Sequence, residues 1–322
     1  MAINNNINSS HNVNSSKALQ LYQRAQQKLN PGCCSALFSN QHERIDKAFN
    51  LFKESAQLYT LDKQYEQAAG SYIKCAEIAQ ANNNEEDPIE FWEEAMHCYK
   101  KTNNIEKYAQ TANKCIHLCK QKSKFKRAGD FELAKAELYE AQVTQEYHKE
   151  AIACYDKGIE CYLLDKDVAH NKVMEAKIRK ADLMCIKGVN GDVNAIAEVK
   201  TIYEETAEGI EMKATELYCK YVICCLVFDD QTNAKVYLEK FVEISERFCN
   251  SKEYWFVRGL VELCDEEEFV VDNIKEYVKK NMKEVKIGVD CKWKEVMLNN
   301  VIKKYEELEK KIPKVFEEED FR

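Results

Sequence analysis

Proline and glycine are scarce in this sequence, and their scarcity argues against β-rich architectures. The 322 residues include only 3 prolines and 9 glycines, whereas sheets need many tight turns built from these residues. Runs of about 18 to 20 apolar residues, which a membrane-spanning helix requires, are also missing. The composition therefore predicts an all-helical chain without a transmembrane segment.

Signatures of catalysis are missing as well. The sequence has no glycine-rich phosphate loop, no Gly-x-Ser-x-Gly, no His-Glu-x-x-His and no paired cysteine knuckle. The formal net charge of -8 also opposes general attraction to nucleic acid. We expect no catalytic residue, no metal ion, no cofactor and no nucleic-acid partner, so an active site assembled from scattered residues is the least favoured alternative.

Cysteine, in contrast, is abundant, with 15 residues. Most lie in helical apolar patterns, such as Cys224 and Cys225, and no signal peptide opens the sequence. In Cys115-x-His117-x-Cys119 a helix turns the histidine away from both thiols, which disfavours a zinc site. The pattern predicts reduced cytoplasmic thiols that pack as small hydrophobic side chains.

The first part of the chain is predicted to be a disordered tail followed by helical hairpins. Residues 1–16 are rich in asparagine and serine, a composition that buries too little surface to fold. A helix is expected from Ser16 to Leu29, where Pro31 follows and ends it. From Ile45 the helices come in pairs, with small and aromatic residues at three- and four-residue steps. The first pair has the stripes Ala48, Phe52, Ala56, Tyr59 and Tyr65, Ala69, Tyr72, Ile73, Ala76.

The hairpins repeat about every 40 residues, a period close to that of tetratricopeptide-like repeats. Each hairpin has an apolar face that only a neighbour can cover. We therefore predict a tetratricopeptide-like α-solenoid of stacked helical hairpins over residues 17–249. Beyond residue 250 the large side chains are less regularly spaced, which predicts a C-terminal helical bundle over residues 250–322 that ends in an acidic tail.

Three surface features stand out from this scaffold. The first is an apolar loop with Cys33, Cys34, Leu37 and Phe38. Such a loop suits shallow insertion into a membrane surface, or else Leu37 and Phe38 cap the first hairpin.

The second feature is basic and the third is acidic. The basic residues are Lys120, Lys122, Lys124, Lys126 and Arg127, joined about one hairpin later by Lys177, Arg179 and Lys180. They form either a solvated face or, if stacking aligns the hairpins, one surface for an acidic partner. The acidic residues are Glu262, Asp265 to Glu268, and the terminal run Glu317 to Asp320 that precedes Phe321. Two faces of opposite charge suggest two partners.

The order and spacing of these features resemble the soluble NSF attachment proteins of the alpha/beta type, from about Ala18 to Arg322. The matching positions are Ala36-Leu-Phe38, the hairpin from Ala48 to Ala76, Tyr99-Lys-Lys101, Ala134-x-Ala-Glu-x-Tyr139, Glu150-Ala-Ile152 with Tyr155, Asp230 with Asn233-Ala-Lys235, and the acidic terminus. Members of this family are helical adaptors that coat the four-helix SNARE bundle and recruit the hexameric ATPase NSF, N-ethylmaleimide-sensitive factor, which pulls the bundle apart.

The resemblance implies a role for each charged face. The basic residues expected to bind the SNARE bundle are Lys101, Lys124, Lys126, Arg127, Lys177 and Lys180. The residues expected to contact NSF are Asp230, Glu262, Asp265, Glu266, Asp320 and Phe321. The resemblance also implies that the loop with Cys33, Cys34, Leu37 and Phe38 touches the membrane and that several copies surround one SNARE complex.

Three positions depart from the family pattern. Phe321 stands where the family has a leucine that stimulates the ATPase, and Asp130 stands where it has a lysine on the SNARE-binding face. Cys33 and Cys34 replace two phenylalanines, which weakens membrane partitioning unless the thiols are acylated.

We therefore predict a SNARE-disassembly adaptor for vesicle fusion and intracellular protein transport, including ER–Golgi transport. It is expected in the cytoplasm and, peripherally, at vesicle, Golgi, vacuolar or plasma membranes. The alternative is a general tetratricopeptide-like scaffold with other clients, which gives the acidic tail no special role.

Overall fold

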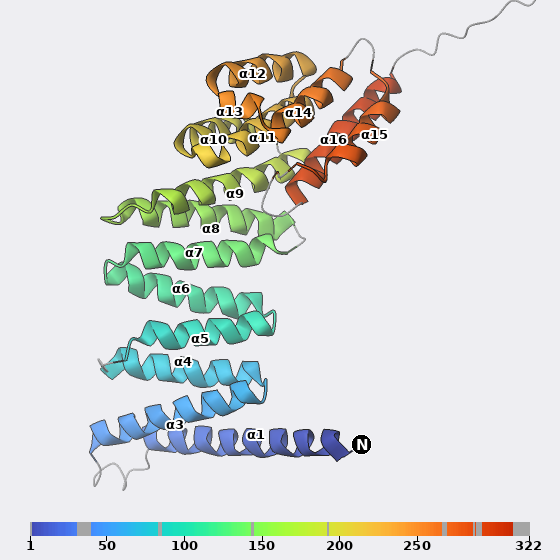
Figure 1. Cartoon of the computed structure of the whole chain (residues 1–322). Coiled ribbons are helices and arrows are strands. Elements are labelled where there is room, and N and C mark those ends of the chain that lie inside the picture. Colours follow the sequence, from blue (N-terminus) through green and yellow to red (C-terminus); the bar gives the residue numbers. More distant parts are fainter. Residues whose placement is uncertain are drawn as a thin grey trace, which may run out of the picture. The chain divides into compact units, whose positions relative to one another are not determined.

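The computed structural model describes residues 2–30, 40–82, 86–142, 145–191, 193–265, 269–285, 287 and 292–311. Within these ranges every regular element is a helix (Figure 1). The chain folds as two compact units. Unit 1 comprises Met1–Ala141 and Glu160–Val168, and unit 2 comprises Gln142–Ile159 and Ala169–Arg322. The all-helical prediction is confirmed.

Unit 1 is a stack in which each helix packs against its neighbours in sequence (Figure 1). Its helices are α1 (Ala2–Leu29), α3 (Gln41–Leu61), α4 (Tyr65–Asn82), α5 (Pro88–Lys101), α6 (Ile105–Gln121) and α7 (Phe125–Glu140). The predicted stripes face the interior, since Ala48, Phe52, Ala56, Ala69 and Ala76 are fully buried. This arrangement is the predicted α-solenoid of stacked hairpins.

The N-terminus differs from the prediction. Helix α1 begins at Ala2, whereas the composition predicts a disordered tail through residue 16. Near that point Ser15 Oγ donates a hydrogen bond to Asp62 Oδ2 at 2.6 Å, and Asn14 Nδ2 donates to Asp62 Oδ1 at 3.3 Å. These polar side chains therefore find a partner at the C-cap of α3, which composition alone does not reveal.

Three turns of unit 1 share one backbone conformation. Lys63, Asn103 and Ser123 have left-handed φ values of 58°, 53° and 54°. The residue after each of them donates its backbone N–H to the carbonyl five residues earlier. The donor and acceptor pairs are Gln64 and Tyr59, Asn104 and Tyr99, and Lys124 and Cys119. This is the Schellman pattern that ends helices, here without glycine. The spacing of Lys63 and Asn103 matches the predicted period of about 40 residues.

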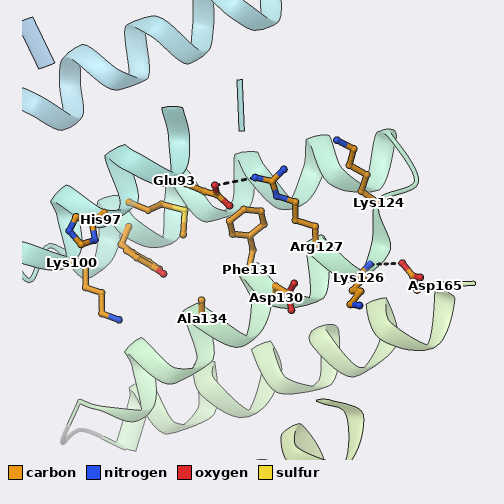
Figure 2. A pocket seen from close by; sticks show the side chains of 12 residues that line it. Glu93, His97, Lys100, Lys124, Lys126, Arg127, Asp130, Phe131, Ala134 and Asp165 are labelled. Atoms are coloured by element: carbon orange, nitrogen blue, oxygen red, sulfur yellow. Dashed lines mark hydrogen bonds and ion pairs between the residues drawn. The ribbon is translucent and has the colours of Figure 1, made fainter. Parts of the chain in front are cut away.

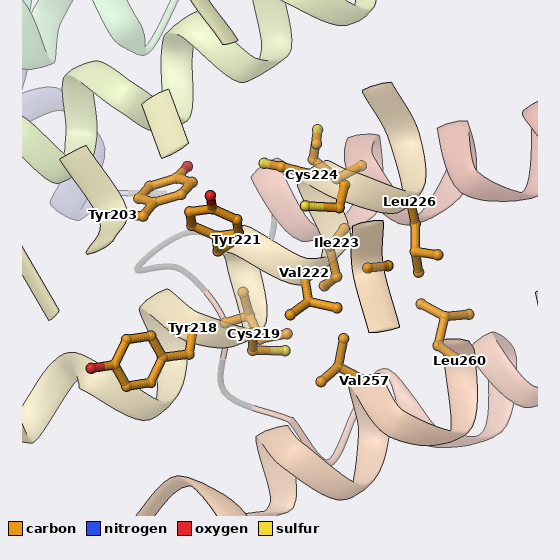
Figure 3. Packing of buried hydrophobic residues seen from close by; sticks show 14 of the residues in the cluster. Tyr203, Tyr218, Cys219, Tyr221, Val222, Ile223, Cys224, Leu226, Val257 and Leu260 are labelled. Carbon is orange, nitrogen blue, oxygen red and sulfur yellow. The ribbon is translucent and has the colours of Figure 1, made fainter. Parts of the chain in front are cut away.

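Unit 2 is organised around one apolar helix. Its elements are α9 (His170–Val189), a 3₁₀ turn (Val193–Ala195), α10 (Ile196–Gly209), α11 (Glu211–Phe228), α12 (Gln231–Ile244), α13 (Glu246–Cys249), α14 (Lys252–Leu263), α15 (Val271–Asn281) and α16 (Lys292–Glu309). Helix α11 packs against α10, α12, α13, α14 and α16. Figure 3 shows its buried residues meeting Val257 and Leu260 of α14.

The change of architecture expected near residue 250 does not coincide with the division into units. One hydrophobic core extends from Ile178 to Tyr305 and includes both sides of that point. The reason lies in α11, where every residue from Leu217 to Leu226 is buried. A helix that is buried on all sides needs neighbours on all sides, so α14 and α16 pack against α11 in addition to α10 and α12.

Helix α8 (Gln145–Leu164) contributes residues to both units. None of the helices described is long and apolar enough to cross a membrane. The cysteines in the described ranges are free, and all are buried except the half-buried Cys249. They pack as the small hydrophobic side chains that the sequence predicts.

Candidate functional site: a charged pocket between α5 and α7

A pocket of about 720 Å³ is lined by residues of α5, α6 and α7 and by Asp165 (Figure 2). Its apolar lining consists of Met96, Tyr108, Phe131 and Ala134. Its charged or titratable lining consists of Glu93, His97, Lys100, Lys124, Lys126, Arg127, Asp130 and Asp165. We call these twelve residues the α5–α7 pocket. A lining that combines apolar side chains with several cations suits a partner that is both acidic and apolar.

The pocket arises because two helices present residues at the spacing i, i+4, i+7, which places side chains on one face. These residues are Glu93, His97 and Lys100 in α5, and Arg127, Phe131 and Ala134 in α7. Arg127 Nη2 lies 3.0 Å from Glu93 Oε2, so one ion pair ties the two helices together (Figure 2). The guanidinium carbon of Arg127 also lies 6.0 Å from the centroid of the Phe131 ring.

Asp87 gathers the cations at one end of this face. Its carboxylate lies 3.7 Å from Lys122 Nζ, 3.5 Å from Lys124 Nζ and 3.5 Å from Arg127 Nη1. It is also the N-cap of α5 and accepts a hydrogen bond from Ile89 N. Burial alone raises the pKa of Asp87, but this hydrogen bond and the three cations outweigh burial and hold that pKa below its usual value.

The start of α7 is capped by a residue distant in sequence. Lys124 occupies the N-cap position but makes no side-chain capping bond. Asp165 Oδ2 instead accepts a hydrogen bond from Lys126 N at 2.8 Å (Figure 2). Asp165 therefore supplies the missing cap and fixes the backbone that carries Lys124, Lys126 and Arg127.

Asp130 adds a negative charge to the pocket at the position where a lysine was expected. Its Oδ1 accepts a hydrogen bond from Tyr162 Oη at 2.7 Å. The ring of Tyr162 lies so close to α7 that a Cβ on Gly129 would be 2.8 Å from it. Asp130 is thus held by the packing of α8 on α7, and the pocket mixes both charges rather than being uniformly basic.

The structure brings together half of the residues predicted to bind SNAREs. Lys124, Lys126 and Arg127 line the pocket. Lys101 is exposed at the end of α5 but does not line it. Lys177 and Lys180 are half-buried on α9 of unit 2.

Sequence reasoning missed Lys100, His97, Glu93 and Phe131 in the pocket, and Asp165 at its edge. The signal for the α5 residues was the helical spacing of Glu93, His97 and Lys100. No sequence pattern could have indicated the role of Asp165, because its hydrogen bond to Lys126 joins residues 39 positions apart.

A family model described as soluble NSF attachment protein, SNAP, matches residues 16–306. The chain belongs to this family. Soluble NSF attachment proteins are adaptors of vesicle fusion rather than enzymes, in agreement with the missing catalytic signatures.

Relatives from yeasts and mammals support the same assignment. The vesicular-fusion protein SEC17 of Komagataella phaffii is 27% identical over 77% of this chain and 83% of its own length. The alpha-soluble NSF attachment protein of Saccharomyces cerevisiae is 24% identical over 89% of this chain and 96% of its own length. The beta-soluble NSF attachment protein of Bos taurus is 22% identical over 73% of this chain and 77% of its own length. The resemblance to the alpha/beta type is confirmed.

Three acidic residues expected to face NSF lie where α12 and α14 meet. Asp230 is the N-cap of α12 and accepts a hydrogen bond from Asn233 N at 2.7 Å. Glu262 pairs with Arg258 at 2.8 Å, and Asp265 pairs with Lys235 at 3.3 Å.

A single hydrogen bond shows how these positions approach one another. Gln231 Nε2 donates to the carbonyl of Val261 at 3.0 Å, which places the residues after Asp230 beside those before Glu262. The remaining predicted contacts lie outside the described residues, namely Glu266, Asp320, Phe321, Cys33, Cys34, Leu37 and Phe38.

Proposed function

We propose that this protein binds assembled SNARE four-helix bundles, including syntaxin-type complexes, and recruits and stimulates the ATPase NSF, which disassembles and recycles them. The observation that supports this most is the α5–α7 pocket, whose lining includes Lys124, Lys126 and Arg127 together with apolar residues. In the proposal the SNARE bundle contacts this pocket together with Lys101, Lys177 and Lys180. NSF contacts Asp230, Glu262, Asp265 and Glu266.

Two lysines of the pocket are available to a partner. Lys100 and Lys126 are exposed and have no ion-pair partner among the described residues. Arg127 and Lys124, in contrast, already lie beside Asp87. An acidic partner would therefore gain most from Lys100 and Lys126, through attraction that salt weakens. Because each exposed ion pair contributes only about 0.2–1 kcal/mol, several copies on one bundle would supply the remaining affinity through avidity.

The two segments outside the described residues have proposed roles as well. The acidic run with Asp320 and Phe321 would contact NSF and stimulate its ATP hydrolysis. The loop with Cys33, Cys34, Leu37 and Phe38 would touch the membrane surface. The protein would then act in the cytoplasm at vesicle, Golgi, vacuolar or plasma membranes, to which it attaches peripherally.

The test is ATP-dependent disassembly of a preformed SNARE bundle by NSF. Wild-type protein is compared with a variant that lacks Phe321 and Arg322. Disassembly by wild type alone would support both the adaptor function and the role of the tail. Equal activity of the two would leave the adaptor function and remove the role of Phe321. No activity with either, beside an active control adaptor, would favour a general scaffold with other clients.

A further inference from the structure

Unit 2 carries a second groove, of about 540 Å³, between α12 and α14. Leu238 and Val242 of α12 and Val261 of α14 form part of its lining, together with the carboxylates of Glu239, Glu243 and Glu262. The groove therefore combines apolar surface with acidic groups. We call it the α12–α14 groove.

An exposed tryptophan lies next to this groove. The side chain of Trp255 on α14 is 59% exposed, although tryptophan is usually well covered. Its ring makes an edge contact with Tyr254, a residue of the groove, at a centroid distance of 5.2 Å. The guanidinium carbon of Arg258, also in the groove, lies 5.5 Å from the Trp255 ring. Tryptophan, tyrosine and arginine are the residues that most often dominate binding energy at protein interfaces.

The indole is presented by a rigid part of the fold. Tyr277 Oη lies 3.2 Å from the Trp255 carbonyl and 3.0 Å from the Phe256 carbonyl, to which it donates. Arg258 is fixed by Glu262 at 2.8 Å and by the Tyr254 hydroxyl at 3.4 Å. These bonds fix the backbone that carries Trp255 and hold the guanidinium beside its ring, so a partner that binds here has fewer groups to order than on a free loop.

The charge left over in the groove is negative. Its two cations are occupied, since Lys235 pairs with Asp265 and Arg258 pairs with Glu262. Glu239 and Glu243 have no ion-pair partner within the described ranges. A lysine or arginine from a partner would find these two carboxylates without a competing cation. The Trp255 indole beside them already has the Arg258 guanidinium over its ring, so it would supply apolar contact rather than a second cation site.

We propose that Trp255 and the α12–α14 groove dock NSF through a segment that carries a lysine or arginine beside an apolar side chain. This inference rests on the proposed function, because the latter names NSF as the partner. Glu262 connects this inference with the proposed function, because it is both a predicted NSF contact and part of the α12–α14 groove. Trp255 acts as the aromatic anchor, and Glu239 and Glu243 receive the cation.

The test measures NSF binding to the protein loaded on a SNARE bundle, with a non-hydrolysable ATP analogue present. Trp255→Ala is expected to lower the affinity for NSF by about tenfold or more. The double variant Glu239→Gln, Glu243→Gln is expected to lower it about threefold and to reduce its salt dependence. Binding of both variants to the SNARE bundle stays unchanged. Met212→Ala is the matched control, because Met212 is 80% exposed on α11 and does not line the groove.

The outcomes separate this inference from the proposed function. If wild type binds NSF and both groove variants bind it equally well, the docking role of Trp255 is overturned while the adaptor function stands. If wild type itself does not bind NSF, both fail. The double variant changes exposed side chains only, so it remains informative if Trp255→Ala lowers the melting temperature.

Discussion

Lys180 Nζ lies 2.8 Å from Asp156 Oδ1, and the same ammonium lies 2.9 Å from Glu198 Oε1. The side chain of Lys180 is only 14% exposed. Two carboxylates around one cation leave a net negative charge, so within the proposed SNARE contact Lys180 would contribute less to binding an acidic partner than Lys126 does. Its structural setting therefore differs from that of Lys126, although the family resemblance assigns both to the SNARE-binding face.

This difference gives the first prediction. The double substitution Lys100→Glu, Lys126→Glu should weaken binding to an assembled SNARE bundle by about tenfold or more at low salt, because attraction becomes repulsion. Lys180→Ala should change that affinity less than about twofold but lower stability by about 1 kcal/mol. Binding is measured by titration at two salt concentrations and stability by thermal melting. Stronger loss of SNARE binding in Lys180→Ala than in the double variant would contradict the assignment.

The second prediction concerns Asp87 and pH. Because the pKa of Asp87 is lowered in the folded state, its stabilising contribution is present above the unfolded value of about 3.9 and is lost as the pH falls through the folded value. Asp87→Asn keeps an N-cap acceptor for Ile89 N but removes the charge. Its melting temperature should therefore fall less than that of wild type between pH 5 and 3.

The same variant also reports on binding. Removal of the Asp87 carboxylate leaves Lys122, Lys124 and Arg127 less neutralised, so Asp87→Asn should bind SNARE bundles more tightly at low salt, by about two- to threefold. The gain should vanish at high salt. An unchanged affinity at low salt would indicate that these cations do not contact the bundle.

The third prediction concerns the cap that Asp165 supplies to α7. Asp165→Ala leaves Lys126 N without its acceptor and should cost about 0.5–2 kcal/mol, whereas Asp165→Asn should cost less. Hydrogen exchange should increase in the first turn of α7, where the amide of Lys126 lies. Asp167→Ala is the control, since Asp167 is exposed and only its backbone amide bonds Asp165. Equal exchange in the alanine variants of Asp165 and Asp167 would contradict the capping role.

A buried ion pair in unit 2 provides the fourth prediction. Lys220 is fully buried, with Nζ 2.8 Å from Asp182 Oδ2 and 3.1 Å from Glu216 Oε1. Lys220→Met leaves buried carboxylate charge without its cation, which should destabilise the fold by about 3–5 kcal/mol. Addition of Asp182→Asn should restore part of the loss. Urea unfolding measures both effects. Lys240→Ala is the control, because Lys240 is 46% exposed and its partner Glu204 is 25% exposed, whereas Lys220 is fully buried. A loss in Lys220→Met no larger than in the control would exclude this role.

The sequence predicted what depends on neighbouring residues. The stripe Ala48, Phe52, Ala56 and Tyr59 is buried as expected, because helical periodicity is a local property. The α5–α7 pocket was predicted only on the α7 side, since its formation depends on which helix lies opposite. Likewise, the residues near Lys180 in sequence do not predict its ion pairs with Asp156 and Glu198, which lie on other helices.

The N-terminus and the core of unit 2 both depend on long-range contacts that the sequence analysis did not predict. Ser15 and Asn14 are ordered by Asp62, which lies 47 and 48 residues away. The core of unit 2 includes residues on both sides of the change of spacing near residue 250, because the later helices α14 and α16 pack against α11. Composition and periodicity report neither kind of long-range contact.

The fifth prediction is that Cys33 and Cys34 carry a thioester-linked lipid that strengthens membrane attachment. Burial raises the pKa of Cys75, Cys115 and Cys264 to about 12, which leaves almost no reactive thiolate in these core positions. Metabolic labelling with a palmitate analogue should therefore give a hydroxylamine-sensitive signal that Cys33→Ser, Cys34→Ser abolishes. Cys249→Ser, at the half-buried cysteine, serves as the control and should keep the signal. One acyl chain gives only marginal membrane binding, and stable attachment takes a second signal. The double variant loses both acylation sites, so it should also shift from membranes to the soluble fraction. A wild-type protein without label would end the acylation hypothesis and leave Leu37 and Phe38 as the apolar groups of that loop.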